Sequence, residues 1–439
     1  MKEKVALICK NGNGFVEALL DIWEAENIAV LIDILSSVKS IEKIILEEKI
    51  TEAYVDSQNE VIILALKNLN IKIIKINVED IMYEELQESS YLKFHSRYAD
   101  DAAIVFFSSG TTDNAKGIVL SHNAINTNAD KIQNYIQGDS DKIIGVVKSL
   151  VHSSTLVGEL LVALKSKMKL FFIKSMSPAL VLKSIQKLNI NIICLNPTLL
   201  QILSKLQKKK KYIFPLLQEI YVSGDIISDF LIFNAESIFG TKVYNVYGVT
   251  ECGPRIAAQQ KGMRNLIGSV GYPLKGVEIY ISKYNKKEYG DIWVKTECFM
   301  NGYLDKNIII SKSNGFWNTG DYGYIESGQL FVLGRSKNII VSAGRNVNPE
   351  IIENMICQTN LVKEIVIIGI PDKIFGEKVI CIYSDEKEKN KQLKDFFQQN
   401  LSPHERPQKI IRVKNSIRRN GNRKIDRNYY RKKFEKDGY

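Results

Sequence analysis

The chain has no long uninterrupted hydrophobic run, since its apolar stretches are short and broken by Lys, Asn or Gly. A membrane-spanning helix needs about 20 consecutive apolar residues, so the sequence predicts no transmembrane segment. The first ten residues include Lys2, Lys4 and Lys10, which leave no apolar core long enough for a signal peptide. These absences predict a cytoplasmic protein with no membrane partner.

The sequence also lacks closely spaced cysteine pairs. Its six cysteines are scattered, at Cys9, Cys194, Cys252, Cys298, Cys357 and Cys381. This spacing argues against a disulfide framework and a zinc site, and it indicates reduced residues in the core. Only Cys252, beside Glu251, is placed where it could line a cleft.

Acidic residues are fewer than basic ones, 49 against 60, which gives a net charge of +11. Such a balance suits nucleic acid, phosphorylated small molecules or an acidic partner protein. The basic runs at 208–211 and 418–433 do not decide among these partners. A nucleic-acid-binding protein would explain the charge but not the ordered motifs described below, so we predict no nucleic-acid partner.

The spacing of apolar runs predicts an α/β fold. Residues 4–80 alternate short apolar runs with helical patterns, as in a parallel sheet. Residues 268–333 change to short strands with Gly turns, which indicates a small antiparallel β subdomain. We therefore predict a large N-terminal domain of αβ layers with this subdomain, 1–335, and a small mobile α+β C-terminal domain, 336–439.

A loop rich in Gly and hydroxyl groups follows the apolar run 102–107. Backbone N–H groups, hydroxyls and one cation there are suited to bind a polyphosphate. These residues are Ser108, Ser109, Gly110, Thr111, Thr112 and Lys116. The loop is not the P-loop of the common NTPases, because Gly117 follows Lys116 where that motif has Ser or Thr. A polar turn between two strands is the alternative interpretation.

The pattern Ser-Ser-Gly-Thr-Thr-x-x-x-Lys-Gly resembles the signature loop of the adenylate-forming (AMP-binding) superfamily. That superfamily comprises acyl- and aryl-CoA synthetases, adenylation domains of nonribosomal peptide synthetases, and luciferases. Four further motifs are similar to the family's and occur in its order: Tyr247-Gly248-Val249-Thr250-Glu251, Thr319-Gly320-Asp321, the hinge segment from Gly334-Arg335 to Gly344, and Arg423-Lys424-Ile425-Asp426-Arg427. The matches extend over about three quarters of the chain.

The resemblance implies ATP-dependent activation of a carboxylic acid. An acyl-adenylate forms, pyrophosphate leaves, and the acyl group passes to the thiol of CoA or of a carrier protein's phosphopantetheine. By resemblance, Glu251 binds Mg²⁺, Lys424 and Thr250 bind the α-phosphate, and the loop holds pyrophosphate. The nucleoside would be held by Asp321 and Arg335 at the ribose and by Tyr247, Gly248 and Gly224 at the adenine.

The family's acid pocket is lined by the segment that here contains His152. Amino-acid-activating relatives carry an Asp near this position, so the resemblance favours an aryl or aliphatic acid without an α-amino group. Glu159, in the following helix, could replace that Asp. Arg255 either binds a second acidic group of the substrate or forms a surface salt bridge.

Three departures from the family pattern affect these expectations. The chain is predicted to lack the family's first few dozen residues, Asn338 replaces a hinge Asp, and Arg423 stands where a Gly usually precedes the lysine. Two alternatives to the CoA ligase therefore stay open. One is a stand-alone enzyme that loads an amino acid on a carrier protein, and the other is a degenerate, non-catalytic adenylate-binding protein.

Overall fold

The computed structural model describes residues 2–78, 81–107, 116–136, 140–175, 177–283, 288–305, 307–359, 361–419 and 425–436. The predicted site residues outside this set are Ser108, Ser109, Gly110, Thr111, Thr112 and Lys424. The chain forms two compact units. The first comprises Met1–Gly224, Ile232–Ile279 and Val294–Trp317, and the second comprises Asp225–Leu231, Tyr280–Trp293 and Asn318–Tyr439. The domain boundary at 335/336 stays a prediction.

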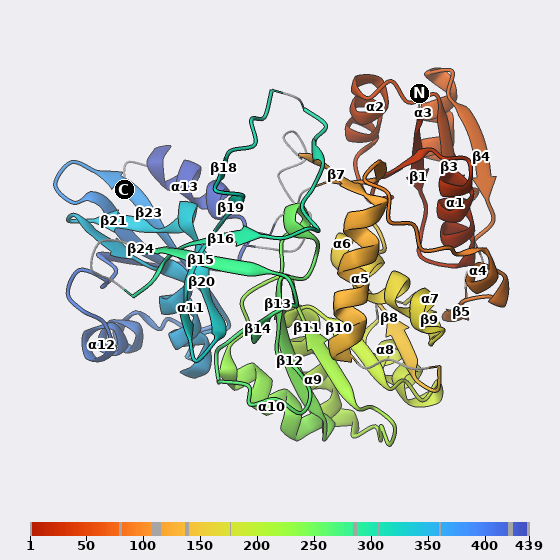
Figure 1. Ribbon diagram of the computed structural model, residues 1–439. Coiled ribbons are helices and arrows are strands. Elements are labelled where there is room, and N and C mark those ends of the chain that lie inside the picture. Colours follow the sequence, from red (N-terminus) through yellow and green to blue (C-terminus); the bar gives the residue numbers. More distant parts are fainter. Residues whose placement is uncertain are drawn as a thin grey trace. The chain divides into compact units, whose positions relative to one another are not determined.

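A largely parallel sheet forms the N-terminal part of the first unit. Its strands are β1 (Lys4–Ile8), β2 (Ile28–Leu31), β3 (Glu52–Asp56), β4 (Lys72–Ile76), β6 (Ala102–Phe107), β7 (Gly117–Ser121) and β17 (Gly302–Tyr303). They lie in the order β17-β7-β6-β2-β1-β3-β4 (Figure 1). Ile45 of α2 (Val38–Glu47) and Leu66 of α3 (Glu60–Asn68) pack on the sheet in one buried core. The predicted strand–helix alternation is confirmed.

A second sheet completes the first unit. Its strands are β5 (Tyr83–Glu85), β8 (Ile143–Val146), β9 (Lys169–Ile173), β10 (Ile192–Leu195), β11 (Glu219–Val222), β12 (Lys242–Tyr247), β13 (Ala257–Ala258) and β14 (Tyr272–Pro273). They lie in the order β14-β13-β12-β11-β10-β8-β9-β5. The inner strands from β9 to β12 are parallel and nearly all apolar, as expected of strands buried on both faces.

Helices accompany both sheets, and some of them, such as α5 (His122–Ile136) and α9 (Pro197–Lys210), have a side chain that caps the first turn. They are α1 (Asn13–Glu24), α4 (Glu88–Lys93), α5, α6 (Ser153–Thr155), the π-helix η1 (Leu156–Leu161), α7 (Val162–Ser166), α8 (Pro178–Lys187), α9, α10 (Asp229–Phe239) and the 3-10 helix η2 (Thr250–Cys252). Before α5, the Ser121 hydroxyl accepts the N–H of Ala124 at 3.0 Å. Ser121 therefore caps this helix.

The predicted antiparallel subdomain is confirmed. Its strands are β15 (Glu278–Lys283), β16 (Gly290–Lys295), β18 (Lys312–Ser313), β19 (Phe316–Glu326) and β20 (Gln329–Arg335). They follow the order β15-β16-β19-β18, and β20 pairs with β19. Antiparallel register joins β19 to both β18 and β20.

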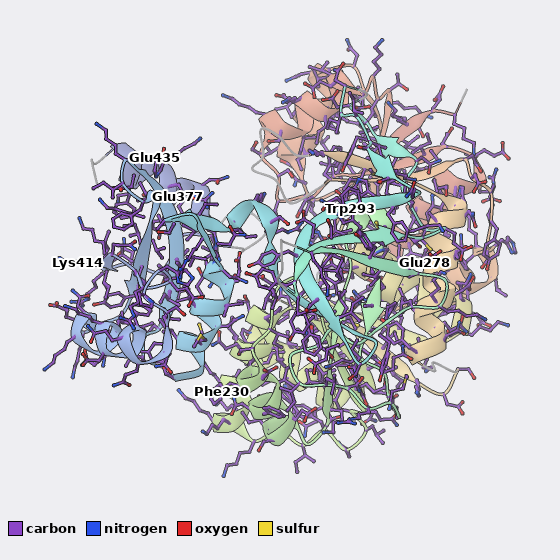
Figure 2. All side chains as sticks on the ribbon, turned by 60° about the vertical axis from the view of Figure 1, so that its left-hand side comes forward. Phe230, Glu278, Trp293, Glu377, Lys414 and Glu435 are labelled. Atoms are coloured by element: carbon purple, nitrogen blue, oxygen red, sulfur yellow. The ribbon has the colours of Figure 1, made fainter. Side chains whose placement is uncertain are left out.

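The C-terminal part of the second unit is α+β, as predicted. It contains η3 (Ser336–Asn338), β21 (Ile340–Ser342), β22 (Arg345–Val347), α11 (Pro349–Thr359), β23 (Glu364–Asp372), β24 (Gly376–Ser384), α12 (Asn390–Asn400), β25 (Lys409–Val413) and α13 (Arg427–Lys436). Ile356 of α11 and Phe397 of α12 belong to one buried cluster, and Phe434 of α13 belongs to another. Charged residues such as Lys414 and Glu435 lie on the outside (Figure 2).

Two predictions about cysteine are wrong. Cys357 is exposed, although its run of apolar neighbours indicated a core position. Cys252 is fully buried and so does not line a cleft. Burial raises the pKa of the Cys252 thiol well above its usual value, which leaves the thiol protonated and unreactive.

Within the described residues, no helix combines the length and the apolar character that crossing a bilayer would require.

Candidate active site

The turn after β12 depends on a close approach of two backbone segments at Gly248. A Cβ atom placed on Gly248 would lie 2.2 Å from the carbonyl oxygen of Pro254. Real Cβ atoms do not approach backbone oxygens so closely, so only glycine fits without moving the chain. Gly248 thus fixes the path of the backbone from Tyr247, the last residue of β12, to Thr250.

Gly248→Ala is expected to displace this turn and to abolish most activity, because backbone atoms cannot move aside as a side chain would. Gly302→Ala is the matched control, since its Cβ would lie 4.0 Å from the Ile310 side chain. The melting temperature and the rate of ATP–pyrophosphate exchange should both fall in Gly248→Ala. Both should stay near the wild-type values in Gly302→Ala. Equal effects of the two substitutions would contradict this account.

Thr250 is positioned by the segment that follows β8. Its hydroxyl lies 2.8 Å from the hydroxyl of Ser153, at hydrogen-bond distance. Ser153 opens α6, and His152 precedes it in extended conformation with an exposed side chain. The structure thus brings the predicted acid-pocket segment and the predicted phosphate ligand Thr250 together. Ser153 was not singled out by the sequence, because a Ser at a helix start usually serves as a cap.

Glu251 and Lys116 both contact Tyr303, a residue that no sequence motif identified. The Tyr303 hydroxyl donates to Oε1 of Glu251 at 3.3 Å, and Lys116 Nζ lies 5.1 Å from the centre of the same ring. Burial and the neighbouring Glu251 charge raise the pKa of Tyr303, so its hydroxyl stays protonated and able to donate. Tyr303 therefore contacts a carboxylate through its hydroxyl and a cation through its ring.

A single carboxylate at this position suits Mg²⁺ better than it suits a metal ion that is bound by protein ligands alone. Among the described residues, no group of three or more His, Cys, Asp or Glu side chains is arranged to hold a metal. Mg²⁺ is usually bound by one or two carboxylates together with water and substrate phosphates. Glu251 is only partly buried, so its carboxylate can serve in that way.

Gly224 lies just after β11, and Tyr247 is the last residue of the adjacent parallel strand β12. Val222 at the end of β11 is paired with Asn245 of β12, so both strands end at the same edge of the sheet. Gly224 has φ 95°, a left-handed conformation that favours glycine, and it is exposed. Open α/β sheets bind ligands at this carboxyl edge, which is where the predicted adenine-binding residues lie.

The predicted ribose ligands Asp321 and Arg335 contact each other in the second unit. Asp321 on β19 is paired in register with Arg335 on β20, and Arg335 Nε lies 2.9 Å from Oδ1 of Asp321. The Thr319 hydroxyl accepts the N–H of Asp321 at 3.1 Å and donates to the carbonyl of Ile292 at 2.9 Å. The Thr-Gly-Asp motif therefore lies within β19, where these bonds hold its backbone and Arg335 pairs with the buried Asp321 carboxylate.

Buried charges lie beside the acid-pocket segment in the first unit. Glu159 in the π-helix η1 is fully buried, and its Oε1 is 2.9 Å from Nζ of Lys148, although the angle is not that of a hydrogen bond. Arg255 is 1% exposed, and its Nε donates to the hydroxyl of Tyr135 at 3.3 Å. The surface salt bridge considered for Arg255 is therefore wrong. The π-helix itself was predicted only as a helical run.

Solved structures share this fold. ATP-bound MatB from Rhodopseudomonas palustris superposes with a TM-score of 0.88 at 20% identity, covering 100% of this chain and 90% of that chain. The o-succinylbenzoate–CoA synthetase from Bacillus subtilis, in complex with its acyl-adenylate intermediate, superposes with a TM-score of 0.82 at 22% identity, covering 98% and 88%. The fold is thus that of the adenylate-forming enzymes.

The chain belongs to the AMP-binding enzyme family. The family model matches residues 1–304, and the model of the AMP-binding enzyme C-terminal domain matches residues 351–424. A curated relative, the 2-succinylbenzoate–CoA ligase of Lactococcus lactis subsp. lactis strain IL1403, is 33% identical over 233 residues, or 52% of this chain. The chain spans about half the length of that relative, 49%. The resemblance stated from the motifs is confirmed.

Proposed function

We propose that this protein activates a carboxylic acid with ATP through an acyl-adenylate and then transfers the acyl group to the thiol of CoA. The observation that carries the proposal is the turn after β12, where Thr250 contacts Ser153 and Glu251 contacts Tyr303. These contacts lie within the region matched by the family model. They gather a hydroxyl, a carboxylate and the nearby cation Lys116 at the carboxyl edge of a parallel sheet.

The reaction needs charge stabilisation more than acid–base chemistry. A carboxylate oxygen attacks the α-phosphorus of ATP, the bond to the bridging oxygen breaks, and pyrophosphate leaves. The CoA thiol then attacks the acyl carbon, and AMP leaves. Negative charge grows on the phosphate oxygens in the first step, so fixed cations and N–H groups there lower the barrier.

The site residues take the following roles in this proposal. Lys424 and Thr250 bind the α-phosphate oxygens, and Glu251 binds Mg²⁺, which neutralises phosphate charge when it is bound. Pyrophosphate is held by Ser108, Ser109, Gly110, Thr111, Thr112 and Lys116. The nucleoside is held by Gly224, Tyr247, Gly248, Asp321 and Arg335, and His152 lines the acid pocket.

The charge arrangement favours an aryl or aliphatic acid without an α-amino group. An amino acid would need a carboxylate to pair with its ammonium, and His152 occupies the expected place. Glu159, the alternative carboxylate, is already paired with Lys148 in the core. The relatives' names point to CoA, and a separate carrier protein's phosphopantetheine is the second acceptor to test. The cytoplasmic location stays a prediction.

The test is a hydroxylamine-trapping screen with ATP, Mg²⁺ and aryl, aliphatic, dicarboxylic and amino acids. Hydroxamate from one class of aryl or aliphatic acid, followed by thioester formation with CoA, is the expected result. Hydroxamate from amino acids alone would support loading of an amino acid on a carrier. ATP binding without product from any acid would support a non-catalytic adenylate-binding protein. A dicarboxylic hit that Arg255→Ala leaves unchanged would exclude Arg255 as a substrate ligand.

A further inference from the structure

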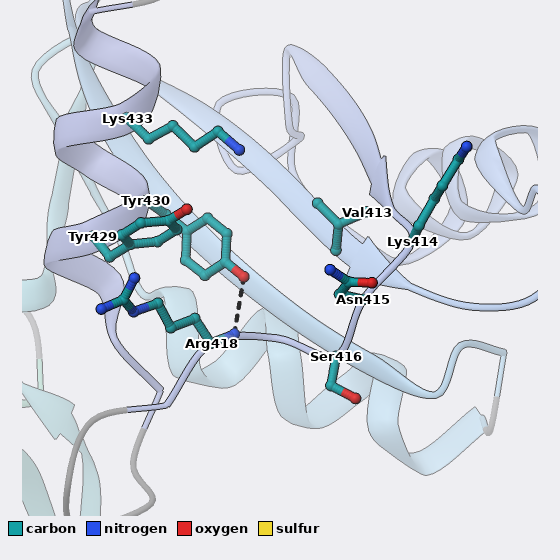
Figure 3. A pocket seen from close by; sticks show the side chains of 8 residues that line it. All are labelled: Val413, Lys414, Asn415, Ser416, Arg418, Tyr429, Tyr430 and Lys433. Atoms are coloured by element: carbon teal, nitrogen blue, oxygen red, sulfur yellow. Dashed lines mark hydrogen bonds between the residues drawn. The ribbon is translucent and has the colours of Figure 1, made fainter.

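A cavity of about 390 Å³ opens on the C-terminal part of the second unit, between the end of β25 and the helix α13 (Figure 3). The residues that line it are Val413, Lys414, Asn415, Ser416, Arg418, Tyr429, Tyr430 and Lys433. Three of these carry positive charge, and no described lining residue is acidic. Its size is within the range of small-molecule sites in proteins.

The walls of this cavity are held by contacts within the unit. Tyr430 is 4% exposed, and its hydroxyl accepts the backbone N–H of Arg418 at 2.9 Å. Since the hydroxyl oxygen accepts in that contact, its own proton is left to donate to another group. The guanidinium of Arg418 lies over the ring of Tyr429, with Cζ 4.3 Å from the ring centre. The aromatic rings thus fix one cation and one hydroxyl donor.

The charges of the cavity are only partly compensated. Arg418 Nε lies 3.7 Å from Oδ2 of Asp426, a long ion pair on an exposed guanidinium. Lys433 is exposed and extends from α13 over the cavity, whereas the exposed side chain of Lys414 points away from it (Figure 3). Cations beside one cavity repel each other, and an anion between them would relieve that repulsion. Two basic side chains with hydroxyl and amide donors suit the oxygens of a phosphate group.

Arg418 also contacts the start of the last helical segment. The N–H of Asp426 donates to the carbonyl of Arg418 at 2.9 Å, and Arg419 and Ile425 form an antiparallel bridge. Arg418 therefore belongs both to the cavity wall and to this pair of backbone contacts, which hold its position.

We propose that this cavity is a second binding site, for a phosphate-bearing small molecule, separate from the residues assigned to ATP. The phosphate can come from inorganic phosphate or from the phosphate of a nucleotide. Arg418 and Lys433 bind its oxygens, with Tyr430 as a neutral donor. The site is independent of the proposed reaction, because binding needs neither an acid substrate nor turnover.

Isothermal titration calorimetry of the full chain tests the site, with inorganic phosphate in one arm and adenosine 3′,5′-bisphosphate in the other. The variant Lys433→Ala is expected to bind about tenfold more weakly, because it loses a charged hydrogen-bond donor. Lys432→Ala is the matched control, since Lys432 is exposed on the same helix and does not line the cavity. It should bind within about twofold of wild type.

The two arms identify the source of the phosphate. Tighter binding of the bisphosphate than of inorganic phosphate would assign the site to a nucleotide, and equal binding would assign it to the free ion. Equal affinity of wild type and Lys433→Ala would overturn the proposal. An equal loss of affinity in Lys432→Ala would also overturn it, because binding would then depend on the general positive charge of α13 and not on the cavity.

Discussion

Replacing Lys424 by alanine is expected to slow acid-dependent exchange of labelled pyrophosphate into ATP by about 10²–10³-fold, the usual effect of removing one group aimed at a developing charge. Lys424 is assigned to the α-phosphate and the bridging oxygen, where negative charge grows as pyrophosphate leaves. Removing a cation from that position raises the barrier of the adenylation step without removing the binding of ATP. The measurement is initial-rate exchange at saturating ATP and acid.

The neighbouring residue Arg423 provides the control for this prediction. It carries the same charge one position earlier, where the family usually has glycine, so Arg423→Ala changes the net charge equally. We expect it to keep exchange within about threefold of wild type, because no contact with a phosphate is assigned to Arg423. Wild-type exchange in Lys424→Ala would remove the catalytic assignment. Equal losses in both variants would indicate a general effect of charge in this tail.

Lys148→Met is expected to destabilise the protein by about 3–5 kcal/mol, because it leaves the buried carboxylate of Glu159 without its counter-ion. The two groups are 2.9 Å apart, and their side chains are 11% and 0% exposed. The exposed pair of Lys169 and Glu85, 3.2 Å apart, is the control. Lys169→Met should change the free energy of unfolding by less than about 1 kcal/mol. Urea unfolding at neutral pH measures both.

The loss of folding stability in Lys148→Met is expected to depend on pH in a defined direction. Burial already raises the pKa of Glu159 above its ordinary value of 4.5, and Lys148 opposes that rise. Without Lys148 the folded-state pKa rises further, so the folded state takes up a proton that the unfolded state releases. The stability from this protonation is fully present below the unfolded pKa and is lost as pH rises through the folded pKa.

The variant should therefore be less destabilised at pH 5 than at pH 8. Adding Glu159→Gln to Lys148→Met removes the unpaired charge with little change of shape and should restore much of the loss at pH 8. A loss that is the same at both pH values, and that Glu159→Gln does not relieve, would show that packing of the lysine stem matters more than its charge.

The local features of the fold were predictable because they are encoded in short stretches. The apolar run Val5–Ile8 and the patterns after it indicated the strand–helix alternation. Motif residues such as Thr250 and Glu251 are close in sequence, so their shared turn followed from spacing. The confirmed family and fold therefore rest on information within a few residues of each motif.

Long-range contacts were not predictable in the same way. Tyr303 reaches Glu251 only because β17 pairs with β7, which lies almost 200 residues earlier, at Gly117–Ser121. Charged residues are rarely buried, so neither the pairing of Lys148 with Glu159 nor the burial of Arg255 had a signal in the sequence. Cys357 lies on the exposed side of α11, although its apolar neighbours in the sequence indicated a buried position.

The most direct test of the central claim is the fate of a carboxylate oxygen. With an acid substrate labelled by oxygen-18 in its carboxyl group, attack on the α-phosphorus predicts that one labelled atom appears in AMP after transfer of the acyl group to CoA. Mass spectrometry of AMP and pyrophosphate from one incubation provides the measurement. Labelled AMP with unlabelled pyrophosphate is the predicted result. Formation of ADP with labelled phosphate, or AMP without label, would contradict activation through an acyl-adenylate.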